Sequence, residues 1–234
     1  MALHLDHIHA RSGTFDLTAD LRIEAGQRVA IIGASGSGKS TLLDVIAGFL
    51  PPVSGKVLWN GADITAKSPA DRPISILFQD TNLFPHLTIA QNLALALNPA
   101  TGRVRSGGMA LIEERLSRVG LSGFGSRRLS EMSGGQQSRA ALARVLVQAR
   151  PVVLLDEPFA ALGPALKDEM LALVAEAAEA EGLTVLLVSH DPKDARRFAQ
   201  QSIVVEAGQV SPPQDTNALL DNPPPALRAY LGAG

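Results

Sequence analysis

The sequence has 234 residues, 46% of them hydrophobic, which predicts a globular protein of one large domain or two closely associated subdomains. Its 21 basic and 23 acidic residues leave a formal charge of −2, which argues against a broad nucleic-acid-binding surface, and the absence of cysteine excludes disulfides, cysteine-bound zinc and thiol catalysis. No uninterrupted apolar segment approaches the roughly 20 residues that a membrane span needs. If the protein works at a membrane, we expect another chain to cross it, and the polar residues among positions 1–9 argue against a signal peptide.

Two stretches near the N-terminus, 3–9 and 15–23, alternate apolar and polar residues. This period of two predicts half-buried antiparallel strands that form a small sheet beside the core. The first stretch carries His4, His7 and His9, which could suggest a metal site. A strand with one solvated face accounts for them more simply.

The apolar run Val29 to Ile32 leads into Gly33-Ala34-Ser35-Gly36-Ser37-Gly38-Lys39-Ser40, and an amphipathic helix from Thr41 to Ala47 follows. The pattern predicts a strand, a phosphate-binding loop and a helix, whose inward N–H groups and positive helix end attract the phosphates of a nucleotide. We expect Lys39 to reach the β- and γ-phosphates and Ser40 to ligate Mg²⁺. The alternative is a glycine-rich turn that happens to end in Lys-Ser.

Gly48 and two prolines should end this helix, and Val57 to Trp59 should enter a tight turn at Asn60-Gly61. Residues 74–78 predict a buried strand that ends in Gln79. In a parallel sheet an amide at this place lies where open α/β sheets bind ligands, although a surface glutamine at a loop start is an equal alternative.

Helical patterns then replace the β/α alternation, with helices expected over 89–97 and 109–119. This change predicts an inserted helical subdomain at roughly 80–150. Within it, Ser133-Gly134-Gly135-Gln136 precedes a helix expected over 138–149. A hydroxyl and free N–H groups at a helix start suit phosphate oxygens, or form only an N-cap.

A second polar cluster follows the buried-type strand 152–155, which runs directly into Asp156 and Glu157. Adjacent acids at the end of a buried strand indicate a cation or a catalytic duty nearby. We expect Asp156 to hold Mg²⁺, directly or through water, and Glu157 to point at the attacking water. A helix over 165–181 should follow.

His190 repeats the pattern after the buried strand 184–188, where it could contact a γ-phosphate or merely cap the helix that begins near Pro192. The last clear strand covers 203–205. The proline-rich tail 211–234 has room only for short helices.

The order and spacing of these polar motifs resemble those of the nucleotide-binding subunit of ATP-binding-cassette transporters over almost the whole chain. The motifs are Gly33–Ser40, Gln79, Ser133–Gln136, Asp156-Glu157 and His190. The resemblance implies an α/β fold: a P-loop NTPase core with a mainly parallel sheet, a small antiparallel β subdomain and an inserted helical subdomain. It also implies one nucleotide-binding domain over 1–234. The nucleotide-binding residues it implies are Gly33, Ala34, Ser35, Gly36, Ser37, Gly38, Lys39, Ser40, Thr41, Ser133, Gly134, Gly135 and Gln136.

The mechanism that the resemblance implies uses ATP and Mg²⁺, with the metal near Ser40, Gln79 and Asp156. Two copies would sandwich two ATPs, each held by the phosphate loop of one copy and by Ser133 to Gln136 of the other. Glu157 and His190 would act at the γ-phosphate, and Gln79 would sense the metal. The implied partners are a second copy, membrane-spanning permease subunits and, indirectly, a periplasmic solute-binding protein, with the chain peripheral on the cytoplasmic face of the inner membrane.

A narrower resemblance covers Leu77 to Thr88, Gln91-Asn92 and Asn98-Pro99, which look like the ATPase subunit of bacterial thiamine importers. The chain departs from the family pattern at four places. Ser12 stands where the family has an aromatic residue that stacks on adenine, so stacking is weakened unless Phe15 takes over this role. Met132 replaces the family's leucine, and Ser138 replaces an arginine or glutamine. Ala160-Ala161-Leu162-Gly163 replaces Ser-Ala-Leu-Asp, which removes a carboxylate that connects the two ATP sites in the family.

Other functions remain open from the residues alone. An importer ATPase for another small solute, such as iron, a polyamine or an anion, would carry the same motifs. A soluble ATPase of the superfamily usually has long coiled-coil insertions or two tandem cassettes, and this sequence has neither. A simple P-loop kinase leaves Ser133–Gln136 and His190 unexplained.

Overall fold

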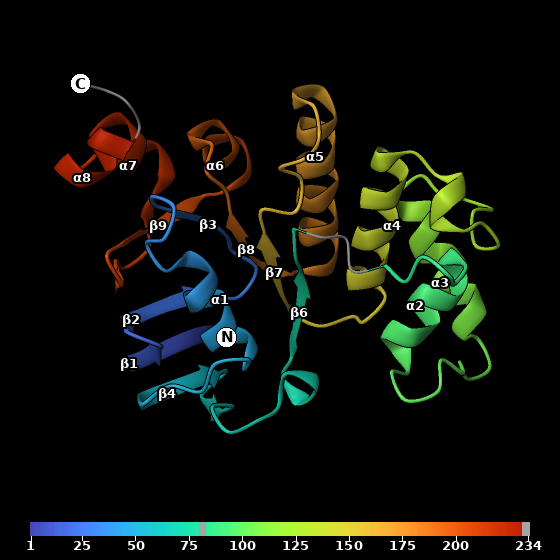
Figure 1. Ribbon diagram of the computed structural model, residues 1–234, viewed down its shortest axis with the longest axis horizontal. Coiled ribbons are helices and arrows are strands. Elements are labelled where there is room, and N and C mark those ends of the chain that lie inside the picture. Colours follow the sequence, from blue (N-terminus) through green and yellow to red (C-terminus); the bar gives the residue numbers. More distant parts are fainter. Residues whose placement is uncertain (80–82, 231–234) are drawn as a thin grey trace. The chain divides into compact units, whose positions relative to one another are not determined.

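The computed structural model describes residues 1–79 and 83–230, which divide into two compact units (Figure 1). The first unit comprises 1–74, 151–157 and 175–234, and the second comprises 75–150 and 158–174. Helices and strands are mixed along the chain, which confirms the α/β fold class. Among the helices of the described residues, none combines the length and the apolar character that crossing a membrane requires.

The first unit is built on one curled sheet of mixed strand direction. Its strands follow the order β5-β4-β1-β2-β10-β9-β3-β8-β7, and β11 pairs with β9. Their bounds are β1 Ala2–Ser12, β2 Phe15–Glu24, β3 Arg28–Ile32, β4 Ser54–Trp59, β5 Ala62–Asp63, β7 Val152–Asp156, β8 Thr184–Val188, β9 Gln201–Glu206, β10 Gln209–Val210 and β11 Gln214–Asp215. The β1, β2, β4 and β5 pairings are antiparallel, whereas β9, β3, β8 and β7 run parallel, as the sequence predicts.

The parallel strands are buried on both faces, since the central residues of β3, β7 and β8 are at most 3% exposed. Such near-continuous apolar runs are typical of parallel strands covered by helices. Their register aligns Ile31 and Asp156 with the same residue, Val188 of β8. The chain therefore leaves β3, β8 and β7 at one edge of the sheet.

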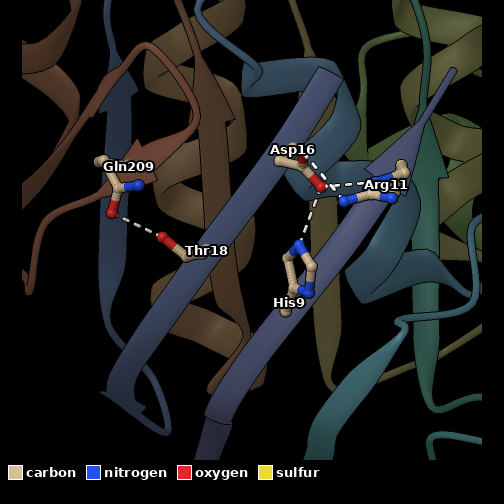
Figure 2. A network of polar contacts seen from close by, with 5 residues as sticks. All are labelled: His9, Arg11, Asp16, Thr18 and Gln209. Atoms are coloured by element: carbon tan, nitrogen blue, oxygen red, sulfur yellow. Dashed lines mark hydrogen bonds and ion pairs between the residues drawn. The ribbon is translucent and has the colours of Figure 1, made fainter. Parts of the chain in front are cut away.

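The β1–β2 pair contains a bulge that its sequence does not reveal. The register shifts between Leu5 and Ile8, and His7 adopts a left-handed conformation with φ 48°. Because the bulge adds a residue, Leu5 and Ile8 both point into the core although they are three apart. The polar face of the pair is solvated: in Figure 2, His9 and Arg11 both contact Asp16, with His9 Nε2 2.9 Å and Arg11 Nε 2.8 Å from its Oδ1.

Hydrogen bonds of Thr18 in β2 attach this strand to β10 and to the turn before it. Thr18 Oγ1 donates to Gln209 Oε1 at 2.6 Å (Figure 2), and the Thr18 N–H donates to the Gly208 carbonyl at 2.8 Å. Thr18 is far from both of these partners in the sequence. The two bonds therefore connect the antiparallel strands to the parallel ones through the turn after β9.

The helices of the first unit are α1 Lys39–Ala47, α6 Pro192–Phe198, α7 Thr216–Asp221 and α8 Pro225–Tyr230, with a short 3₁₀ turn at Pro69–Asp71. Gly48 ends α1 in a left-handed conformation, as predicted. Beside it, Arg72 is 2% exposed, and its guanidinium donates to the carbonyls of Val45 at 2.8 Å and Ile46 at 2.7 Å. Arg72 thus satisfies carbonyls that the last turn of α1 leaves without a helical partner.

The second unit is mainly helical. It contains α2 Ile89–Leu97, α3 Gly108–Arg118, a 3₁₀ turn at Leu129–Glu131, α4 Gly134–Leu146 and the first part of α5 Pro164–Glu181, and most of β6 Ile74–Leu77. Helices α2, α3 and α4 pack on one another. The expectation of one domain with a helical subdomain at roughly 80–150 stays a prediction.

Some expected boundaries were wrong. The strand expected over 74–78 ends at Leu77, so Phe78 precedes Gln79 outside the strand. The helix expected over 138–149 runs from Gly134 to Leu146, because Ser133 caps it four residues earlier than predicted. Within its described residues the tail forms the two-residue strand β11 and the six-residue helices α7 and α8, so its helices are short, as expected; residues 231–234 lie outside the described residues.

Candidate functional site

Three chain segments leave the same edge of the parallel sheet. The phosphate loop follows β3, Glu157 follows β7 and His190 lies two residues beyond β8. The Glu157 N–H donates to the Val188 carbonyl at 3.2 Å, which continues the pairing of β7 with β8. The first unit thus brings the expected phosphate loop and two expected catalytic side chains together, where open α/β sheets bind ligands.

The glycines of the phosphate loop are required by close contacts. A Cβ on Gly33 would lie 2.2 Å from the Val205 carbonyl oxygen, a backbone atom that has little freedom to move. Gly38 caps α1 with φ 111°, and a Cβ there would lie 2.9 Å from the Phe15 ring. Only glycine fits both positions, so the loop keeps its N–H groups at the start of α1 in the arrangement that binds phosphate.

Lys39 lies along this loop and is only 8% exposed. Its Nζ donates to the carbonyls of Gly33 and Ala34, both at 2.8 Å. Burial lowers the pKa of Lys39, and the nearby charges of Glu157 and Asp156 oppose this shift. The ammonium group is therefore held against the loop and faces two carboxylates.

Asp156, the last residue of β7, is half-buried behind the loop. Burial raises the pKa of its carboxyl group, while a hydrogen bond from Ser40 and the charge of Lys39 lower it. Burial, and then the charge of Asp156, also raise the pKa of Asp44 in α1. A desolvated carboxylate beside a hydroxyl is a set of hard oxygen ligands, which suits Mg²⁺.

Glu157 adopts a left-handed conformation with φ 47°, which is uncommon for a residue with a side chain. Its Oε2 lies 3.4 Å from His190 Nδ1, and the two side chains are 29% and 59% exposed. Both groups are therefore accessible to solvent while they remain close to each other. A carboxylate and an imidazole at this separation can share the positioning of a water molecule and a phosphate oxygen.

A cleft of about 410 Å³ lies over the phosphate loop. It is lined by Ser12, Phe15, Gly33, Ser35, Gly36, Gly38, Lys39, Ser40, Thr41, Glu157 and His190. Ser12 and Phe15 face each other at the end of the β1–β2 pair. The aromatic ring at this edge of the cleft is thus Phe15, the residue that the sequence suggested as the substitute for the missing aromatic.

The remaining expected residues belong to the second unit. Gln79 is exposed just after β6. Ser133 and Gln136 form a capping box, in which the Ser133 hydroxyl accepts from the Gln136 N–H at 3.3 Å and the Gln136 side chain accepts from the Ser133 N–H at 3.0 Å. A Cβ on Gly135 would lie 2.7 Å from Leu166 in α5, whereas one on Gly134 would meet no atom of the described residues within 4 Å. How these residues act on a nucleotide stays a prediction.

Sequence reasoning missed the support behind the phosphate loop. The Gly208 N–H donates to the Ser37 carbonyl at 3.0 Å, so the turn after β9 is hydrogen-bonded to the phosphate loop. Nothing in the sequence near Gly208 indicates this contact, since the two residues meet only when β9 pairs with β3. Ser189 and Asp194, beside His190, were also missed.

These features together define a P-loop nucleoside triphosphatase. They are a phosphate loop at a helix start, a buried lysine, a carboxylate suited to a metal ion, and an acid near an imidazole.

The family model described as "ABC transporter" matches residues 18–160. The chain is 59% identical over 230 residues to a thiamine import ATP-binding protein of Cereibacter sphaeroides, covering 98% of this chain and 99% of the relative. A protein of the same name from Ruegeria sp. is 58% identical over 231 residues, covering 99% of this chain and all of the relative.

Solved structures of ATP-binding cassettes also resemble this chain. An ATP-binding cassette of an ABC transporter in its ADP conformation matches with a TM-score of 0.88 and 26% identity over 99% of both chains. A nucleotide-free cassette matches with a TM-score of 0.84 and 27% identity, over 95% of this chain and 96% of the other. The chain therefore belongs to the ABC transporter family, in which it is an ATP-binding ATPase.

Proposed function

We propose that this ATPase energises the import of thiamine or thiamine phosphates through a membrane permease. The single observation that carries the proposal is the 59% identity to a thiamine import ATP-binding protein over 98% of the chain. The resemblance of residues 77–99 to thiamine importer ATPases points the same way, although residues 80–82 in that stretch lie outside the described residues.

In the proposed mechanism, the N–H groups of the phosphate loop, with Lys39, Ser40 and Thr41, bind the triphosphate of ATP. Glu157 orients the attacking water and accepts its proton, since its carboxylate opens on the cleft. His190 donates a hydrogen bond to a γ-phosphate oxygen. The 3.4 Å separation of Glu157 Oε2 and His190 Nδ1 supports this division, because both groups can reach one phosphate and its attacking water.

Ser40, Asp156 and Gln79 are the residues that would hold Mg²⁺. Ser40 and Asp156 fit this role on their chemistry, because a hydroxyl and a half-buried carboxylate are hydrogen-bonded to each other behind the loop. When bound, Mg²⁺ neutralises charge on the β- and γ-phosphate oxygens. Gln79 would sense the state of the site and transmit it to the permease.

We also propose that two copies bind two ATPs between them, with Ser133 to Gln136 of one copy against the γ-phosphate held by the other. Two features of α4 support this. The Ser133 hydroxyl accepts a bond within the capping box, so its own proton can serve a phosphate oxygen. A Cβ added to Gly134 would have no atom of the described residues within 4 Å, which leaves the helix start approachable.

The proposed location is the cytoplasmic face of the inner membrane, where the chain binds membrane-spanning permease subunits and works indirectly with a periplasmic solute-binding protein. The helical residues of roughly 80–150 are the proposed docking surface. Co-purification tests this: a tagged chain should retain a permease after extraction in mild detergent. Recovery of the chain without any membrane protein would favour a soluble ATPase of the family instead.

The substrate is tested by deletion in a thiamine auxotroph. We expect growth on low external thiamine to fail and to recover when the intact chain is supplied, but not when Lys39→Ala is supplied. Uptake of other vitamins and of metals is the control and should stay normal. Normal thiamine uptake in the deletion strain, with loss of iron, polyamine or anion uptake, would assign the ATPase to another importer.

A further inference from the structure

Two buried polar side chains, Ser189 and Asp194, lie beside His190 and have no role in the mechanism above. They are 5% and 3% exposed. The Ser189 hydroxyl donates to the Asp194 carboxylate. Asp194 lies in the first turn of α6, and its own N–H donates to the Asp191 carbonyl at 3.1 Å. The pair therefore connects the end of β8 to α6 underneath the segment that carries His190.

The Ser189 hydroxyl also accepts the N–H of Asp191 at 3.1 Å. The Ser189 hydroxyl oxygen is thus hydrogen-bonded both to the peptide N–H that follows His190 and to Asp194 in α6. On the other side, β8 fixes Val188, whose carbonyl accepts the Glu157 N–H at 3.2 Å. His190 is held between these two attachments, with its imidazole directed at Glu157.

We propose that Ser189 and Asp194 are positioning residues for ATP hydrolysis, which hold the backbone around His190 so that its imidazole stays in reach of Glu157 and the γ-phosphate. Neither residue is among those that line the cleft, so neither is placed to touch a nucleotide bound there. They act through His190. The buried carboxylate strengthens the bond from the hydroxyl, because a charged acceptor makes a shorter and stronger hydrogen bond than a neutral one.

The proposal rests on the role proposed for His190, so the test includes that residue. Ser189→Ala removes the bridging hydroxyl, and Asp194→Asn removes the charge of its partner while keeping its shape. We expect each variant to lower kcat roughly 10-fold, less than the about 10²-fold that a misplacement of 1 Å can cost. ATP affinity, measured with a fluorescent analogue, should stay within about twofold because the phosphate loop is untouched.

A double-mutant cycle separates positioning from a general structural role. In a His190→Ala background, Ser189→Ala and Asp194→Asn should cause no further loss of kcat, because the side chain that they position is absent. A loss of the same size in both backgrounds would overturn the inference. If His190→Ala alone turns over ATP at the wild-type rate, the role proposed for His190 fails, and this inference fails with it.

Ala195→Gly is a matched control. Ala195 follows Asp194 in α6, is 1% exposed and takes no part in the bridge through its side chain. The glycine should lower the stability of the helix, because glycine is a weaker helix former than alanine, and kcat should remain that of the wild type. If Ala195→Gly lowers kcat as much as Asp194→Asn does, turnover reflects the stability of α6, and the positioning role is refuted.

Discussion

Replacing Glu157 by glutamine should separate ATP binding from hydrolysis. The amide keeps the shape of the side chain and its reach to His190 Nδ1, which lies 3.4 Å from Glu157 Oε2. The left-handed backbone at φ 47° constrains glutamate and glutamine alike, so the local fold should not change. What disappears is the carboxylate that we propose accepts a proton from the attacking water.

The size of the loss follows from the position of Glu157. A positioned general base contributes roughly 10²- to 10⁴-fold, and a side chain that is 29% exposed in an open cleft belongs at the lower end. We therefore expect Glu157→Gln to slow hydrolysis by at least about 10²-fold, which corresponds to about 2.7 kcal/mol of barrier. The free energy of unfolding should stay within about 0.5 kcal/mol of wild type.

Single-turnover hydrolysis and size-exclusion chromatography measure the two consequences. With Mg·ATP bound but not consumed, Glu157→Gln should elute as a dimer that the wild type forms only transiently. Lys39→Ala is the contrasting control: it removes the ammonium that binds the loop carbonyls at 2.8 Å, so ATP binding and dimerisation should both be lost. Hydrolysis by Glu157→Gln at the wild-type rate would show that Glu157 is not the catalytic carboxylate.

Four further substitutions test separate parts of the reasoning. Gly163→Asp restores the carboxylate of the family pattern and should raise the Hill coefficient or the turnover; a Cβ there meets no described atom within 4 Å, so the side chain has room. An unchanged Hill coefficient and turnover in a stable variant would count against coupling of the two ATP sites through this loop. Gly33→Ala should abolish ATP binding, because its Cβ would lie 2.2 Å from the Val205 carbonyl oxygen; binding at wild-type affinity would refute that contact. Gly134→Ala should keep the stability of the monomer but weaken the ATP-dependent dimer, and an unchanged dimer in sedimentation would contradict the proposed sandwich. Arg72→Lys should cost about 3 kcal/mol in urea unfolding, because one ammonium cannot replace a guanidinium bonded to carbonyls at the end of α1; a loss under about 1 kcal/mol would refute this.

The sequence predicted the elements well where local signals are strong. The helix over 89–97 and the strand over 184–188 have the predicted bounds, because a capping box and a buried apolar run mark them. It failed where two signals compete. The sequence predicts that the helix after Ser133-Gly134-Gly135 begins only at 138, yet the capping box of Ser133 and Gln136 starts it at Gly134 despite its two glycines.

By itself, the sequence determined the fold class, the phosphate loop and the order of polar residues after buried strands. These depend on interactions among neighbouring residues, such as helix capping, glycine backbone freedom and the alternation of a strand. The family and the ATPase activity follow from the same motifs, which match known relatives across nearly the whole chain.

Only the tertiary structure decided which of those residues meet. Glu157 lies beside His190 because β7 and β8 pair in the register that aligns Asp156 with Val188, and no local pattern specifies that register. The bulge at His7 and the contact of Gly33 with Val205 have the same origin. Strand pairing joins residues that are distant in the chain, so their contacts are set by packing of the whole core rather than by the residues next to them.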